Sequence, residues 1–365
     1  MPGDAATAPS PPNTTLPRDA LDAADAGGPL PAKAAEASRS VASFHIVGRF
    51  DTRDPEGPRF GWAGTEIRAR FSGSDLKVEL ADTGISHYDV TVDGGPPRLL
   101  DVAGPRRTYD LASGLAPGLH ELVLTKRTES FAGVTQLFRF VGDLVPMDPP
   151  SGRRIELIGD SITCGFGVLG PDATCGFSPE TQSEPIAWGA LAAKQLGALR
   201  MVTAVSGMGV LRNFDGSLTD TMPERYDRSL ADDATSAWTH DAFAADVVVV
   251  NLGTNDFAGG KGDPGPDFQR AYTKLLTNVR GRHADAWIVT ATSPMLGPEN
   301  GAKLRAYVAG AIAARASAGD TRLSLLEIGT QSALDGYGCG YHPSITTHRR
   351  MATLLVNHVK TLMAW

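Results

Sequence analysis

The sequence is poor in cysteine, in runs of a single charge and in long apolar stretches. Its 365 residues include 3 cysteines, too few to hold a chain of this size together, so stability has to come from a buried core. Lys and Arg total 34 against 41 Asp and Glu, and no basic run stands out, so we expect no nucleic-acid partner. The longest apolar runs, such as 247–250, are far too short to cross a bilayer, so we expect no membrane-spanning segment.

Several catalytic motifs are also missing. The sequence has no Walker A motif and no G-x-S-x-G motif, so we expect neither a P-loop nor the nucleophile elbow of an α/β-hydrolase. It also has no H-E-x-x-H motif, and its 8 histidines do not cluster with cysteines, so we expect no zinc site. Residues 165–170 match G-x-G-x-x-G, but Pro171 and further turn residues follow where a dinucleotide site needs a helix. We therefore expect neither a metal nor an organic cofactor.

The overall composition is typical of a globular protein, with 42% hydrophobic and 21% charged residues. Residues 1–40 are rich in Ala, Pro, Asp and Ser and lack aromatic residues, which predicts a disordered tail or linker. No basic segment followed by an apolar one is visible there, so no signal peptide is predicted from the sequence as written. Because tails of this kind often tether exported domains, we expect an extracytoplasmic location.

Residues 41–148 show the pattern of β-strands. Side chains alternate in character along 66–71, 76–80 and 88–92, and Gly and Pro turn signals separate these runs. Without a helical period, this spacing predicts an antiparallel sandwich or jelly roll. The Asp-Pro-Pro sequence at 148–150 then predicts a domain boundary.

Residues 149–365 alternate predicted strands with predicted helices. The strands are expected at 155–158, 201–205, 247–251, 287–290 and 323–328, and the helices at 186–196, 268–282, 303–316 and 344–363. Apolar strands alternating with helices predict an α/β domain with a parallel sheet covered on both faces. Ligands bind such sheets beyond the carboxyl ends of the strands.

Four short segments carry residues suited to catalysis. Segments 159–162, 206–209 and 253–256 each follow a predicted strand, and segment 342–344 opens the last predicted helix. Three strand ends and one helix start can converge on a single crevice, so the four segments together are a strong signal although each alone is weak.

These segments supply what ester hydrolysis needs. Ser161 offers a hydroxyl, and His342 is the expected base that takes its proton during attack on a carbonyl. The developing oxyanion needs fixed donors, for which we expect the Ser161 and Gly207 N–H groups and the Asn255 amide, with Gly209 as the rival of Gly207. A proline after His342 favours extended backbone there, and the adjacent helix N-terminus is expected to keep the imidazole neutral.

Each of these residues also has a structural explanation. Ser161 could cap a helix, Gly207 could serve a turn, and Asn255 could brace its loop. Asp160 and Asp256 are expected to hold neighbouring loops by hydrogen bonds and not to act as bases.

The four segments resemble those of the SGNH (GDSL-type) hydrolase superfamily, whose name residues match Ser161, Gly207, Asn255 and His342. The likeness extends to carbohydrate esterase family 2 through the segments 47–50, 60–64, 126–129, 159–167, 206–213 and 342–351. This resemblance covers roughly residues 44–365. It implies a jelly-roll domain packed on a flavodoxin-like SGNH domain. It also implies an acetylesterase that acts on O-acetylated plant polysaccharides or sugars through an acetyl-enzyme.

The sequence departs from the superfamily at the third catalytic residue. An aspartate usually stands two or three residues before the histidine, where this chain has Gly340 and Cys339. Either a backbone carbonyl orients His342, as thought for some members of the family, or Asp335 reaches its Nδ1 from further upstream. Tyr341 stands where the family tends to have tryptophan and could stack on a sugar face or pack within its loop.

Two alternative functions stay open. A lysophospholipase or thioesterase would use the same groups on a longer acyl chain, although no broad apolar lid is visible. A carbohydrate-binding protein with an inactive site would rely on the β domain.

Cys164 and Cys175 flank the glycine-rich loop, and a disulfide between them would suit an exported protein, although spacing alone does not establish it.

Overall fold

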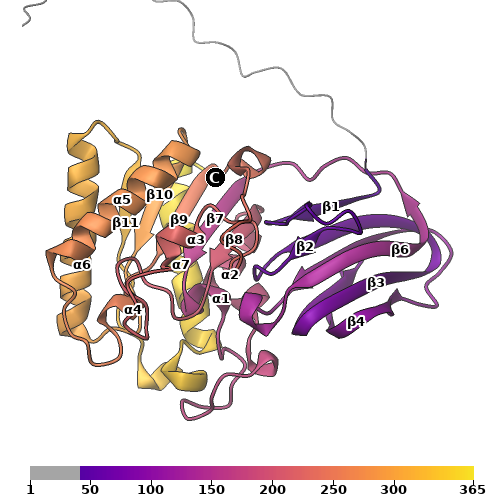
Figure 1. Cartoon of the computed structure of the whole chain (residues 1–365), viewed down its shortest axis with the longest axis horizontal. Coiled ribbons are helices and arrows are strands. Elements are labelled where there is room, and N and C mark those ends of the chain that lie inside the picture. The colour runs from indigo at the N-terminus through magenta and orange to yellow at the C-terminus, as the bar shows by residue number, and fades with distance from the viewer. Residues whose placement is uncertain (1–41) are drawn as a thin grey trace, which may run out of the picture. The chain divides into compact units, whose positions relative to one another are not determined.

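The computed structural model describes residues 42–365, and the predicted tail at 1–40 lies outside the described residues. The described chain first forms a β-rich domain and then a mixed α/β domain (Figure 1). None of the helices in this range combines the length and the apolar character that crossing a membrane requires.

The β-rich domain is a six-stranded antiparallel arrangement. Its strands are β1 (Phe44–Val47), β2 (Arg59–Phe60), β3 (Glu66–Val92), β4 (Arg98–Ala112), β5 (Leu119–Lys126) and β6 (Thr135–Val145). The three strands predicted between 66 and 92 form one continuous strand of 27 residues. Register shifts after Ser72 and after Asp82 bend this strand, as bulges do. Its two ends therefore pair with the same strand, β5.

The core of the β domain follows from the two-residue period of its strands. Leu76, Val78 and Leu80 of β3 have no exposed surface, whereas Lys77 between them is exposed.

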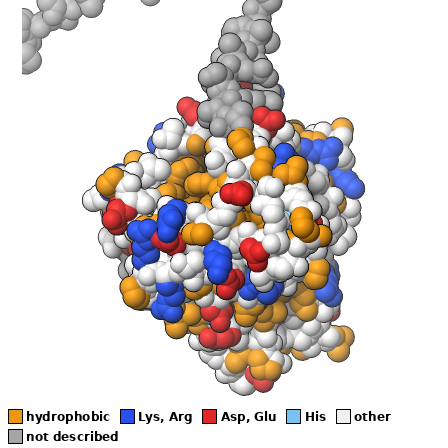
Figure 2. All heavy atoms as spheres, turned by 90° about the vertical axis from the view of Figure 1, so that its right-hand side faces the viewer, with side chains coloured by type: hydrophobic (Ala, Val, Ile, Leu, Met, Phe, Trp, Pro, Cys, Tyr) orange, Lys and Arg blue, Asp and Glu red, His pale blue; other side chains and the backbone are white. Residues whose placement is uncertain are grey.

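On the face drawn in Figure 2, Lys and Arg side chains are interspersed with Asp and Glu. Exposed pairs such as Arg70–Glu121 at 3.0 Å give the outer surface of the domain this mixed charge.

The α/β domain contains a five-stranded parallel sheet in the order β11-β10-β9-β7-β8. The strands are β7 (Arg154–Gly159), β8 (Leu199–Ala204), β9 (Val247–Asn251), β10 (Trp287–Ala291) and β11 (Leu323–Leu326). In chain order this is 2-1-3-4-5, the order of flavodoxin-like folds. The helices are α1 (Ser161–Cys164), α2 (Trp188–Gln195), α3 (Met222–Arg225), α4 (Thr254–Phe257), α5 (Pro266–Arg282), α6 (Pro298–Ser317) and α7 (Ile345–Met363). All five predicted strands and all four predicted helices are present, and α6 begins earlier than predicted, at a proline suited to a first turn.

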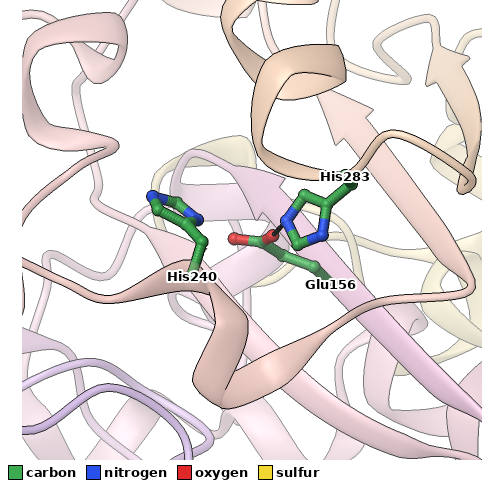
Figure 3. A group of neighbouring side chains, drawn as sticks. All are labelled: Glu156, His240 and His283. Carbon is green, nitrogen blue, oxygen red and sulfur yellow. Dashed lines mark hydrogen bonds and ion pairs between the residues drawn. The ribbon is translucent and has the colours of Figure 1, made fainter. Parts of the chain in front are cut away.

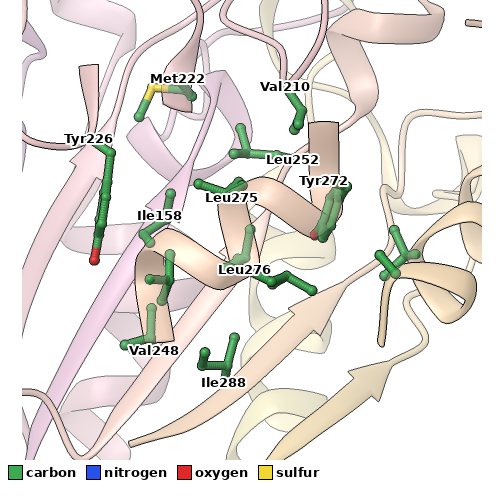
Figure 4. Packing of buried hydrophobic residues seen from close by; sticks show 14 of the residues in the cluster. Ile158, Val210, Met222, Tyr226, Val248, Leu252, Tyr272, Leu275, Leu276 and Ile288 are labelled. Carbon is green, nitrogen blue, oxygen red and sulfur yellow. The ribbon is translucent and has the colours of Figure 1, made fainter. Parts of the chain in front are cut away.

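Helices cover both faces of this sheet. On one face, Leu275 and Leu276 of α5 pack with Val248 and Ile288 of the strands (Figure 4). On the other face, α2 and α7 pack against strand residues such as Val249. Alternate strand residues therefore enter opposite cores, which explains why the strands read as continuous apolar runs.

Candidate active site

The four predicted segments meet at the carboxyl ends of neighbouring parallel strands. Ser161 follows β7, Gly207 follows β8, and Asn255 lies on α4 after β9. His342 comes just before α7, and all four residues line one cavity of about 440 Å³. The structure therefore brings together residues that lie far apart in the sequence.

The turn from β7 into α1 places Ser161. At Gly159 a Cβ would lie 2.1 Å from the Thr163 hydroxyl, so glycine is required for the helix to return this closely. Asp160 caps the helix, and its Oδ1 accepts from the Ile162 N–H at 3.0 Å. Ser161 is the first residue of α1, so its N–H has no partner within the helix.

His342 lies between Ser161 and a backbone carbonyl. Its Nε2 is 2.8 Å from Ser161 Oγ, and its Nδ1 is 3.0 Å from the Cys339 oxygen. A carbonyl only accepts, so the proton is on Nδ1, and Nε2 is left free to accept from the serine hydroxyl. The backbone at His342 is extended, as predicted, with φ −70° and ψ 163°.

The imidazole of His342 is held neutral mainly by burial. Burial lowers the pKa of His342 from 6.5 to about 4, although hydrogen bonds to the backbone of Cys339 and Gly340 oppose the shift. The expectation of a neutral base therefore agrees with this direction. Its cause differs from the one inferred from sequence, which was the helix N-terminus.

Asp335 does not reach His342. Its carboxylate pairs with Arg350 at 2.6 Å, and its backbone oxygen accepts from the Ser344 hydroxyl at 2.7 Å. The sequence left a backbone carbonyl and Asp335 as the two possible partners of His342 Nδ1, and the structure has the Cys339 carbonyl there.

The loop after β8 presents Gly207. Gly207 has φ +81°, a conformation that favours glycine, and its N–H donates to no group within residues 42–365. The rival, Gly209, donates to Asn213 Oδ1 at 3.0 Å, so its N–H is already used within the loop. Asn255 Nδ2 donates to the Met208 oxygen at 2.9 Å and lies 3.4 Å from Asp160 Oδ2.

Asp256 and Asp160 brace these loops, as predicted. The Asp256 carboxylate accepts from the N–H groups of three successive loop residues, Val210, Leu211 and Arg212, at 2.8–2.9 Å. Burial raises the pKa of Asp160 to about 7, against the opposing hydrogen bond from Ile162. Neither carboxylate bonds to His342.

The disulfide considered between Cys164 and Cys175 is not formed. Cys175 pairs with Cys339 across 164 residues, with Cα atoms 4.6 Å apart, and Cys164 is free and buried. The reason is that α1 places Cys164 in the buried core that α2 and α7 form with the sheet. Gly170 leaves room for the bridge, because a Cβ there would lie 2.2 Å from Cys339 Sγ.

Aromatic side chains that the sequence analysis missed form the walls of the cavity. Phe166 stacks on His342 with ring centres 4.2 Å apart, and Phe177 lies 5.0 Å from Phe166. Phe214 also lines the cavity. Their only sequence signal is proximity to the glycine-rich loop and to Gly207. The predicted substrate contact, Tyr341, is 61% exposed beside His342 but is not among the residues that line the cavity.

A separate buried cluster has the composition of a metal site. Glu156, His240 and His283 place ligand atoms within 4.8 Å of one another (Figure 3). Both Glu156 oxygens are already bound, one by Arg49 Nη2 at 2.8 Å and the other by His283 Nε2 at 2.8 Å. The Arg49 guanidinium occupies the place that a metal cation would take. These residues therefore suit an ion pair between the two domains better than they suit a metal site.

Comparison with protein families gives a model for each domain. A model described as carbohydrate esterase 2 N-terminal matches residues 46–150. A model described as GDSL-like lipase/acylhydrolase family matches residues 157–350.

The chain is similar to known proteins over most of its length. Cellulase/esterase CelE of Acetivibrio thermocellus is 35% identical over 321 residues, covering 87% of this chain, which spans only 39% of that relative. An acetylxylan esterase/glucomannan deacetylase of Cellvibrio japonicus is 26% identical, covering 88% of this chain and 89% of that protein. A solved family two carbohydrate esterase from Clostridium thermocellum, in complex with cellohexaose, has a TM-score of 0.82 and 34% identity, covering 88% of this chain and 99% of that chain.

Proposed function

The chain belongs to carbohydrate esterase family 2, and we propose that it is a serine esterase that removes O-acetyl groups from carbohydrates. The observation that carries this proposal is the 2.8 Å contact between Ser161 Oγ and His342 Nε2 at the wall of an open cavity. The printed names of two relatives, acetylxylan esterase/glucomannan deacetylase, support an acetylated polysaccharide as the substrate class.

In the first half of the proposed reaction, Ser161 Oγ attacks the acetyl carbonyl carbon while its proton passes to His342 Nε2. The Nδ1–H stays on the Cys339 carbonyl, which holds the ring in place. The oxyanion accepts from the N–H groups of Ser161 and Gly207 and from one hydrogen of the Asn255 amide, which gives up its long 3.4 Å contact with Asp160 Oδ2. The imidazolium then protonates the departing sugar oxygen, and the acetyl group remains on Ser161.

In the second half, water enters as the sugar leaves. His342 takes one water proton while the oxygen attacks the acetyl carbon, and the same donors hold the oxyanion. Ser161 Oγ then leaves with the proton from His342, which releases acetate. No step in this scheme needs a cofactor.

The finer parts of the fold prediction also belong to this proposal. The pairing of both ends of β3 with β5 supports a strand that passes from one layer of a jelly roll to the other. We also keep in the proposal the domain boundaries after residues 40 and 148. They separate a tail, a β-sandwich domain and an SGNH hydrolase domain. A sugar-stacking role for Tyr341, whose 61% exposure leaves its ring accessible, stays part of the proposal too. The Cys175–Cys339 disulfide supports an extracytoplasmic location.

Acetate release from acetylated xylan and acetylated glucomannan tests the activity directly. We expect release by the wild-type protein and a loss of at least about 10³-fold in Ser161→Ala, because the nucleophile is removed. The matched control is Ser332→Ala, since Ser332 is a helix cap outside the cavity. Release that is unchanged in Ser161→Ala would contradict the mechanism.

The acyl preference separates acetylesterase from a lysophospholipase or thioesterase. We expect p-nitrophenyl acetate to be hydrolysed with a higher kcat/KM than p-nitrophenyl octanoate. A preference for the longer chain would reject the acetylesterase. Binding of the polysaccharide without any hydrolysis would favour the non-catalytic alternative.

A further inference from the structure

A glutamate from the β domain enters the catalytic domain beneath the cavity. Glu129 lies between β5 and the 3₁₀ turn Ser130–Ala132, and it has no exposed surface. Its Oε2 accepts from the Ser206 N–H at 2.6 Å, and its Oε1 accepts from the Ser206 hydroxyl at 2.5 Å. Gln182 Nε2 donates to the same Oε1 at 2.8 Å. Three donors from the second domain therefore hold one carboxylate from the first.

A buried carboxylate with so many partners needs an explanation. Removing an ion from water is costly unless hydrogen bonds replace its hydration. A simple domain anchor could use apolar contacts, and this interface already has the buried pair Arg49–Glu156 at 2.8 Å. What distinguishes Glu129 is that two of its three bonds go to a single residue at the cavity wall, Ser206.

Ser206 directly precedes Gly207, the expected oxyanion donor. Gly207 has no side chain, and within the described residues its N–H binds nothing. The direction of that N–H therefore depends on its neighbours. On one side, the Phe214 N–H binds the Gly207 oxygen at 2.7 Å. On the other side, Glu129 fixes both the backbone and the side chain of Ser206.

We propose that Glu129 is a positioning residue that fixes the Gly207 N–H toward the oxyanion through Ser206, so that the β domain completes the catalytic site. This inference rests on the proposed function. A preorganised donor needs no reorganisation during the reaction, and a donor that is misplaced by about 1 Å loses much of its effect. Removal of the constraint should therefore affect the transition state more than substrate binding.

The test is Glu129→Gln, which keeps the shape of the side chain but turns an NH₂ group toward one of its present donors. We expect kcat on p-nitrophenyl acetate to fall roughly 10- to 100-fold while KM changes less than about twofold. Labelling with a fluorophosphonate, together with circular dichroism, counts the folded active sites so that kcat is given per competent enzyme.

The matched control is Glu66→Gln. Glu66 is also a buried β-domain carboxylate that crosses to the second domain, but its partner there, Arg200 at 2.7 Å, does not line the cavity as Ser206 does. We expect its kcat to stay within about twofold of the wild type. An equal fall in kcat in both variants would show a general domain effect and overturn the proposal.

Ser206→Ala keeps the inference testable if Glu129→Gln does not fold. This variant removes the hydroxyl bond only, and we expect a fall in kcat of roughly three- to tenfold. If both variants fold, the double variant should be no slower than Glu129→Gln alone, because both act through Ser206. A folded Glu129→Gln with wild-type kcat, or a change confined to KM, would overturn the proposal. If the wild type shows no hydrolysis that depends on Ser161, the proposed function fails instead.

Discussion

The orienting partner of His342 is a carbonyl and not a carboxylate. The Cys339 oxygen fixes the tautomer as an aspartate would, at 3.0 Å from Nδ1. A carbonyl carries no charge, so it stabilises the imidazolium less than a carboxylate would. It also cannot be protonated, so acid does not remove it. The position usually given to aspartate is therefore free to form a turn.

Asp335→Asn should leave most of the activity intact, because Asp335 contacts Arg350 and not His342. We expect kcat/KM on acetylated xylan to stay within about threefold of wild type. His342→Ala, which removes the proposed base, should lose at least about 10³-fold. Comparable losses in the two variants would show that Asp335 supports His342 and would contradict the role of the Cys339 carbonyl.

At the scale of elements, a cystine joins two segments that border the cavity. Cys175 lines it, and Cys339 supplies the carbonyl beside His342. The bridge is reinforced by the Gly340 N–H, which donates to the Cys175 oxygen at 3.0 Å. Gly340 adopts its positive φ of 59° without cost, but Tyr341 has φ 58°, which is unfavourable for a residue with a side chain, so this short turn needs external support.

Reduction of this cystine should slow catalysis without unfolding the protein. We expect kcat to fall by about tenfold in a non-denaturing phosphine reductant, because the orienting carbonyl gains freedom, and to recover on reoxidation. Thiol titration of the oxidised, unfolded chain should find one free cysteine, Cys164. The control is Cys175→Ser/Cys339→Ser, whose activity should not respond to the reductant. Full activity of the reduced native protein would show that the bridge does not position His342.

The elements differ in how far their sequences could predict them. The strand and helix pattern was predictable because buried parallel strands are continuous apolar runs. The meeting of Ser161 and His342 was predictable because strand ends and helix starts converge. The pairing of Cys175 with Cys339 was not, since it depends on loop paths that have no period. Glu129 lies in the segment 126–129 that carried the family resemblance, but its contact with Ser206 was missed, because a single polar residue in a turn gives no signal of the domain it enters.

At the scale of the whole molecule, buried charges join the two domains. Arg49 and His283 bind the two oxygens of Glu156, and Thr203 donates to one of them at 2.9 Å. Burial would raise the pKa of Glu156, but the His283 bond and the Arg49 charge outweigh it and lower the pKa to about 2. The folded protein therefore holds the ionised form more tightly than the unfolded chain does.

This pKa shift predicts an acid-sensitive stability. Because the folded pKa is the lower one, the stabilisation is present above about pH 4.5 and is lost as the pH falls toward 2. At about 1.4 kcal/mol per tenfold change in proton affinity, the contribution is about 3 kcal/mol. Urea unfolding at a series of pH values, for the wild type and Glu156→Gln, measures it. The difference in unfolding free energy should shrink from neutral pH toward pH 2, and a constant difference would contradict the assignment.

The crossing of Glu129 from one domain into the other bears on how the two halves of this chain can be recombined with those of other proteins. A catalytic half excised at the Pro149-Pro150 junction would lack the carboxylate beneath Ser206. If the N-terminal half is exchanged, this contact is kept only where the new half places a carboxylate at the same position. Protein engineers who wish to graft this cavity onto another scaffold should therefore transplant both halves as a single cassette.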